Sequence, residues 1–190
     1  MPNWCQNSIM IPLTHKKAFM RKFTTKRRMV YFLGKGQFLS EPIEHCLSFH
    51  RILRMPTLPE VMQRKWLEQN CGTTHNAHDA HFAIHDDCEH AGMFEITFDT
   101  AWSPAGEKLI EQIAKRLHCD VEHVYLEEGQ DSYGIREFKF ETGEHSDEPE
   151  LFFMQTAEDN EDTYQTIVTR FFGYSEYADE LMERYMENTQ

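Results

Sequence analysis

The stretch "MFEITFDTAWSPAGEKLIEQIAKRLHCDVEHVYL", residues 93–126, decides the fold. Its first ten residues alternate apolar and polar side chains, which is typical of a strand with one buried face. Ser103 and Pro104 suit the N-cap and first position of a helix predicted over 103–118, whose apolar residues recur at helical spacing. A strand is predicted again over 120–129, so the stretch contains a strand, a helix and a strand.

The rest of the chain continues this succession of strands and helices. Periodicity and turn signals predict strands over 7–13, 80–87 and 132–143, and helices over 14–28, 57–70, 161–173 and 175–190. Residues 151–155 either add an edge strand or pack as a loop. Residues 29–56 mix short apolar runs with glycine and proline, and we expect short strands or loops there. The order predicts an α+β fold in which a split β-α-β antiparallel sheet carries two helices on one face.

A chain of 190 residues that is 40% hydrophobic can bury one sizeable core. We expect one domain over 1–143, with an insertion at about 29–79 after the first helix, and an acidic linker with a C-terminal helical extension over 144–190. No segment approaches the ~20 apolar residues of a membrane span. The five cysteines are odd in number and scattered, which argues against a disulfide framework and favours the cytoplasm.

Charge is unevenly distributed along the sequence. The chain carries a net −13, and residues 1–28 contribute +7 without an acid, which leaves −20 for the rest. From Glu141 to the C-terminus the sequence contains fourteen acidic residues and only two basic ones, Arg170 and Arg184. Such a density repels nucleic acid and suits either basic partners or a solvated surface.

Two motifs carry a resemblance to a known family. The start "MPNWCQNSIMI" and the stretch "FDTAWSPAGEKLIEQIAKRLHCDVEHVYLEEGQDSYGI" at 98–135 are similar to the YubB-like family of phage- and plasmid-borne proteins. The matching residues are Pro2, Asn3, Trp4, Cys5, Asn7, Phe98, Thr100, Ala101, Trp102, Ser103, Pro104 and the segment Glu127–Gly134. The resemblance implies a ferredoxin-like fold and a mobile-element origin, with no established reaction and no catalytic residues. The chain departs from the family at Cys71 and His75, where aromatic residues are usual.

The stretch "CGTTHNAHDAHFAIHDDCEH", residues 71–90, is rich in metal-ligand residues. Cys71, His75, His78 and Cys88 offer zinc four ligands if the loop folds back on the next hairpin. Their spacing matches no standard zinc finger. The alternative is a set of exposed strand histidines and buried cysteines, and no other cofactor is expected. Cys5 is likewise either a reactive thiol or a small buried strand residue.

The predicted helix at 15–28 is a candidate phosphate-binding element. Its cationic residues include Lys16, Lys17, Arg21, Lys22, Arg27 and Arg28. Ferredoxin-like sheets are used in RNA recognition, but this chain lacks the aromatic motifs of that class, and its acidic remainder opposes polyanions.

No catalytic constellation is recognisable, so we expect a non-enzymatic interaction protein rather than an enzyme. The acidic C-terminal region would bind a basic host protein, such as a nucleic-acid-binding or defence component that it antagonises. The candidate partner-binding residues are Glu176, Asp179, Glu180, Glu183, Tyr177 and Tyr185. Phosphate binding, zinc-dependent function and self-association stay open.

Overall fold

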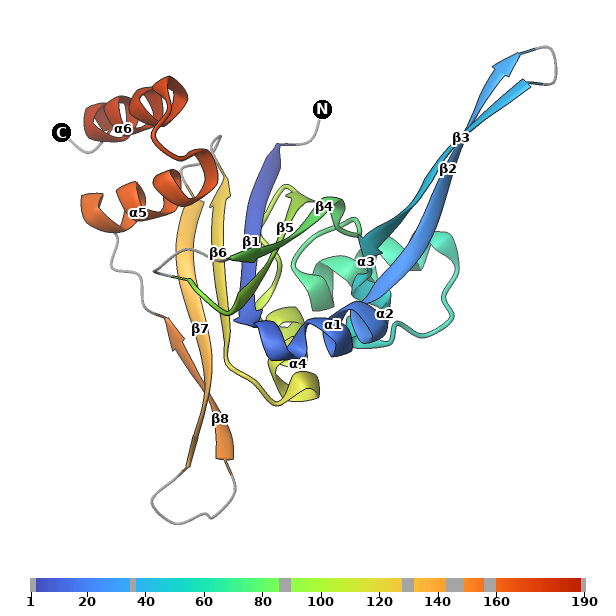
Figure 1. Ribbon diagram of the computed structural model, residues 1–190, viewed down its shortest axis with the longest axis horizontal. Coiled ribbons are helices and arrows are strands. Elements are labelled where there is room, and N and C mark those ends of the chain that lie inside the picture. The colour runs from blue at the N-terminus through green and yellow to red at the C-terminus, as the bar shows by residue number, and fades with distance from the viewer. Residues whose placement is uncertain are drawn as a thin grey trace.

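Strand β1 lies in the middle of an antiparallel sheet in the computed structural model of this protein (Figure 1). The sheet has six strands in the order β4 (His78–His85), β5 (Met93–Ala101), β1 (Trp4–Pro12), β6 (Val121–Glu127), β7 (Ser132–Thr142) and β8 (Pro149–Gln155). The first four strands of this order, with one helix after β1 and another after β5, form the predicted ferredoxin-like unit. β7 and β8 extend that unit at one edge.

The helices are α1 (Lys16–Phe23), α2 (Phe49–Leu53), α3 (Glu60–Cys71), α4 (Glu107–Leu117), α5 (Glu161–Phe172) and α6 (Glu176–Asn188), with a 3-10 turn at Leu13–His15. The structure describes residues 3–34, 37–85, 90–127, 132–142, 149–155 and 160–188, but no side chain at 27–34, 37–44, 142, 149–150 or 154–155. None of the described helices is both long and apolar enough to cross a membrane.

Helices cover both faces of the sheet. α1 and α4 pack on one face, where Phe19, Phe94 and Ile110 belong to one fully buried cluster. α5 and α6 pack on the other face, over β6 and β7, where Val124, Tyr164 and their neighbours form a second cluster. Figure 1 shows these two helices on the opposite side of the sheet from α1 and α4. We call the two sides the α1/α4 face and the α5/α6 face.

The prediction of a helix over 14–28 is wrong at its C-terminal end. α1 ends at Phe23, and Thr24 begins β2 (Thr24–Gly34), which pairs with β3 (Gln37–Leu47) in a separate two-stranded ribbon. The Thr24 hydroxyl donates to Met20 O at 2.6 Å and so satisfies a carbonyl of the last turn. The predicted short strands or loops over 29–56 are also corrected, because this stretch contains long strands and α2. Figure 1 shows the ribbon extending away from the sheet.

The prediction that Ser103 and Pro104 begin a helix is also wrong, since α4 starts at Glu107. Tertiary hydrogen bonds hold the residues before Glu107 outside the helix. The Ser103 hydroxyl donates to the carbonyl of Gly72, and Gly106 N donates to Cys71 O at 2.7 Å. α3 in turn starts at Glu60, three residues after the predicted start of the helix at 57.

Asn7 connects β1 to the start of α4. Its Nδ2 donates to Cys5 O at 2.8 Å and to Thr100 Oγ1 at 2.9 Å. Its Oδ1 accepts from Ala105 N at 2.9 Å and from His123 Nε2 at 3.1 Å. The side chain is fully buried, and both polar atoms of its amide have partners inside the protein, as buried polar groups require.

We expect Asn7→Ala to lower the free energy of unfolding by about 2–4 kcal/mol, because it leaves several buried polar groups without partners. Urea unfolding followed by circular dichroism measures the change. Gln69→Ala, at an exposed position of α3, is the control and should change the free energy by less than about 0.5 kcal/mol. Equal losses for the two variants would contradict the role of Asn7.

Buried His123 predicts that stability depends on pH. Burial, and then the charges of Arg136 and Arg170, lower the pKa of His123 well below its ordinary 6.5. Below about pH 6.5 the unfolded chain therefore binds a proton that the folded chain does not, so stability decreases as pH falls. The loss reaches at most about 1.4 kcal/mol per pH unit for one proton.

Urea unfolding between about pH 7.5 and 5.5 tests this linkage. The wild-type protein should lose stability as pH falls, and His123→Gln should lose less, because glutamine donates to Asn7 without titrating. If the two proteins lose stability in parallel over this range, His123 is not the group responsible.

Candidate functional site

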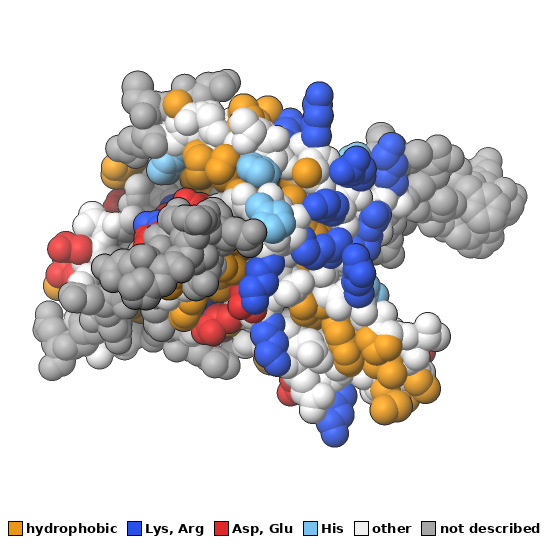
Figure 2. All heavy atoms as spheres, turned by 90° about the horizontal axis from the view of Figure 1, so that it is seen from below, with side chains coloured by type: hydrophobic (Ala, Val, Ile, Leu, Met, Phe, Trp, Pro, Cys, Tyr) orange, Lys and Arg blue, Asp and Glu red, His pale blue; other side chains and the backbone are white. Residues whose placement is uncertain are grey.

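A groove lies between α1 and the base of the β2–β3 ribbon. Its lining residues are Lys16, Lys17, Met20, Arg21, Thr24, Lys26, His45 and Arg51. Five of these eight side chains are Lys or Arg and none is a carboxylate, so the groove is electropositive. Figure 2 shows Lys and Arg side chains gathered on this side of the molecule.

Arg51 of α2 projects toward the end of α1. Its Nη1 donates to Thr24 O at 2.7 Å and its Nη2 donates to Arg21 O at 2.9 Å. Backbone carbonyls therefore position the guanidinium without neutralising its charge. Because Arg51 is exposed, this charge acts on whatever enters the groove.

Arg116 at the end of α4 enlarges the positive surface. It donates to the carbonyls of Arg51 at 2.6 Å and of Ile52 at 2.8 Å, and it lies 4.7 Å from the centroid of the Phe23 ring. Burial, and then the neighbouring charges of Arg54 and Arg51, lower the pKa of Arg116. These three like charges repel one another, so a bound anion would stabilise the arrangement.

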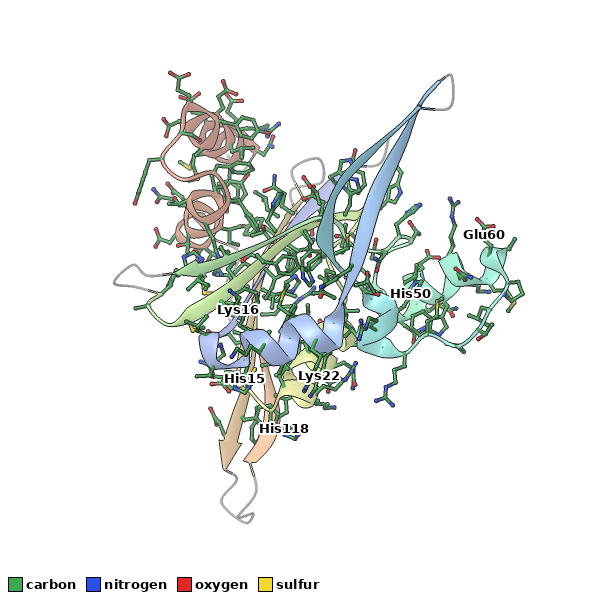
Figure 3. All side chains as sticks on the ribbon, turned by 45° about the vertical axis from the view of Figure 1, so that its right-hand side comes forward. His15, Lys16, Lys22, His50, Glu60 and His118 are labelled. Atoms are coloured by element: carbon green, nitrogen blue, oxygen red, sulfur yellow. The ribbon has the colours of Figure 1, made fainter. Side chains whose placement is uncertain are left out.

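The lysines and arginines of this surface lack carboxylate partners within the part of the chain that the structure describes. The residues are Lys16, Lys17, Arg21, Lys22, Lys26, Arg51, Arg54 and Arg116, which together we call the cationic face. Lys22 Nζ donates to Arg116 O at 2.6 Å, so it too is positioned by a carbonyl. Figure 3 shows Lys16 and Lys22 on α1, near His118 at the end of α4.

The predicted phosphate-binding residues are partly brought together. Lys16, Lys17, Arg21 and Lys22 lie on α1 as expected, whereas the side chains of Arg27 and Arg28 lie outside the described residues. Sequence reasoning missed Arg51, Arg54 and Arg116. Nothing in their local sequence marks them, because only folding brings α2 and α4 beside α1.

The predicted partner-binding residues divide into two groups on α6. Glu176, Asp179, Glu180 and Glu183 are exposed. Tyr185 instead packs inward, with its ring stacked 4.4 Å from that of Tyr164 between centroids. Tyr177 is 42% exposed and contacts the Phe172 ring edge-on at 5.1 Å. The carboxylates thus face solvent, and Tyr185 helps to dock the helix pair.

The predicted zinc ligands lie in different environments. Cys71 is fully buried at the end of α3, His75 is exposed beside Thr74, and the His78 ring lies 5.1 Å from that of Trp4. Cys88 lies outside the described residues. Among the residues that are described, no three His, Cys, Asp or Glu side chains gather closely enough to hold a metal ion.

Three cysteines have protonated, buried thiols. Burial, and then the charge of Glu127, raises the pKa of Cys5 to about 12. Burial also raises the pKa of Cys71 to about 12, and the pKa of Cys119 is raised to about 12 by burial and then by Asp120. A thiol that stays protonated is a poor nucleophile, so the geometry favours the structural reading of Cys5.

The four-stranded unit of β4, β5, β1 and β6 with α1 and α4 defines a ferredoxin-like α+β protein. Comparison with known proteins supports this class. Residues 77–167 match the model of the ferredoxin-like domain in Api92-like protein. The matched segment contains β4, β5, α4 and β6, which form the C-terminal part of the ferredoxin-like unit, together with β7, β8 and the first half of α5.

A crystal structure of the protein api92 from Yersinia pseudotuberculosis is similar in fold to most of this chain. It superimposes with a TM-score of 0.51 and 8% identity, covering 83% of this chain and 100% of that chain. At this identity the likeness concerns the fold alone. No curated protein matches the sequence.

The thiol environments predict which cysteines react. After brief treatment of the native protein with iodoacetamide near pH 8, Cys5, Cys71 and Cys119 should remain unmodified, because almost none of each thiol is ionised. Peptide mapping by mass spectrometry measures modification at each position. Protein unfolded in urea is the control, in which all three should react. Rapid modification of Cys5 in the native protein would contradict its assignment as a buried structural residue.

Proposed function

We propose that the protein is a non-enzymatic nucleic-acid-binding module that contacts phosphates through the cationic face. The observation that carries this proposal is the gathering of eight Lys and Arg residues without a described carboxylate partner. Unneutralised Lys and Arg groups on one surface are what a phosphate backbone requires. Contacts of this kind recognise the backbone rather than the base sequence.

The acids of α5 and α6 are compatible with this function because of where these two helices lie. The exposed carboxylates of α5 and α6 belong to the α5/α6 face, across the sheet from the cationic face. Exposed charges that are separated by more than the Debye length, about 8 Å at physiological ionic strength, are largely screened from one another. Salt therefore screens these acids from a polyanion bound on the opposite side.

The groove suggests how a strand would bind. Lys17, Arg21 and Lys26 are exposed along it, and Arg51 lies at its α2 side. We propose that the phosphates follow this row. The resemblance of the sequence to the YubB-like family further suggests a protein of a phage or plasmid that acts in the cytoplasm of its bacterial host.

Fluorescence anisotropy with labelled DNA and RNA oligonucleotides at increasing salt tests this proposal. If about four phosphates are contacted, the logarithm of the affinity should fall against the logarithm of the salt concentration with a slope of about −3 to −4. Arg21→Glu should weaken binding by about tenfold or more and make the slope shallower by about one.

Arg184→Glu provides the matched control, because it reverses an exposed arginine on α6 and changes the net charge equally. It should leave the affinity within about twofold, since it lies outside the cationic face. Equal effects of the two reversals, or no binding at low salt, would contradict the proposal.

A second candidate function is the binding of a basic host protein by α6, including antagonism of a host defence component. The observation in its favour is the row of exposed carboxylates on the solvent side of a helix whose Ala178 and Leu181 are buried. Affinity capture with wild-type protein and with a Glu176→Gln, Glu180→Gln, Glu183→Gln variant tests it. A host protein retained by the first and lost by the second is expected, and identical recoveries would exclude this surface.

A further inference from the structure

A cleft lies between α5 and the α5/α6 face of the sheet, away from the cationic face. Glu95 and Glu122 come from the sheet, Asp162 and Arg170 come from α5, and His85 lies at the end of β4. Part of the wall is apolar. It is formed by Met10, Val124, Ile135 and Ile167. A concave site with an apolar wall and a few convergent polar groups is typical of a site for a small ligand or a single side chain.

The guanidinium of Arg170 contacts side chains of the protein itself. Its Nη1 donates to Glu122 Oε1, its Nη2 donates to Ser8 Oγ at 3.2 Å, and its Nε lies 3.6 Å from Glu95 Oε1. The side chain is only 15% exposed. Among the described residues that line the cleft, Arg170 is the one arginine, and its charge is paired with two carboxylates of the protein, so it is poorly placed to bind an anionic ligand.

Glu95 is charged and also occupied. The Ser8 hydroxyl donates to its Oε1 at 2.5 Å, and His85 Nε2 donates to its Oε2 at 2.7 Å. Burial alone would raise the pKa of Glu95, but these two hydrogen bonds and the charge of Arg170 outweigh burial and lower the pKa. The Glu95 carboxylate therefore balances the charge of Arg170.

Two carboxylates keep acceptor capacity toward the cleft. Glu122 uses Oε1 for Arg170, and its side chain is 33% exposed. Asp162 is exposed in the first turn of α5, and its carboxylate accepts no hydrogen bond from the described residues. With Arg170 occupied and these acceptors available, the cleft suits a ligand that donates hydrogen bonds and carries positive charge.

We propose that this cleft binds an aliphatic ammonium group. The three N–H donors of the ammonium would face Glu122 and Asp162, and its alkyl stem would lie along the wall that includes Val124 and Ile135. The ammonium belongs either to a free amine or to a lysine side chain of another protein. This site is independent of the cationic face, since it lies on the other side of the sheet and takes the opposite charge.

NMR titration of the ¹⁵N-labelled protein tests this assignment with two probes, 1,5-diaminopentane and the capped peptide acetyl-Gly-Lys-Gly-amide. Amide signals of Thr166 and Thr169, which line the cleft, should shift in a saturable way. 1-Pentanol, which has the stem without the charge, should cause no saturable shift. Saturation by both probes identifies the ammonium as the recognised group, whereas saturation by one alone identifies the source as the free amine or the lysine side chain.

Asp162→Asn and Glu122→Gln should each weaken binding of the responding probe by about fivefold, which corresponds to the ~1 kcal/mol of a partly exposed ion pair. Asp162→Asn preserves the contacts of Arg170, so it tests the site even if Glu122→Gln disturbs α5. Glu187→Gln, at an exposed position of α6, is the control and should leave the affinity unchanged. No saturable shift with either probe, or equal affinities for Asp162→Asn and Glu187→Gln, would overturn the proposal.

Discussion

The buried amide of Asn7 is the interaction on which the arrangement of this protein depends. It joins the central strand to Thr100 at the end of β5, to the backbone of Ala105 before α4, and to His123 on β6. Arg136 of β7 adds a hydrogen bond to the carbonyl of Ala105 at 2.9 Å. Three neighbouring strands and the entry to α4 are therefore fixed at one point, and the α1/α4 face is built around it.

The sheet separates two surfaces of opposite character. The α1/α4 face carries cations positioned by carbonyl groups, and the α5/α6 face carries exposed carboxylates and a cleft in which Arg170 is balanced by acids. The net charge of −13 is a sum over the whole chain, so it does not show that one face is cationic and the other acidic. The separation would allow the proposed anion and ammonium sites to coexist on one small chain without mutual neutralisation.

Sequence reasoning succeeded where local periodicity and burial agree. The alternation in β5, the apolar stripe of α4 and the stripe of α5 gave the correct elements, and their order gave the ferredoxin-like fold. It failed where distant contacts decide a boundary. Ser103 has the local signature of an N-cap, but its hydroxyl is used by Gly72, and the end of α1 depends on the pairing of Thr24 with Leu47 of β3.

The sequence by itself determined the order of the elements, the sheet with two helices on one face, and the cationic character of α1. Each of these follows from the chemistry of neighbouring residues. Only the tertiary structure decided the two candidate surfaces. Arg51 and Arg116 join α1 although 65 residues separate them in the chain, and Arg170 meets Glu95 across the interface of α5 with the sheet. Such sites depend on packing between distant segments, which local periodicity does not encode.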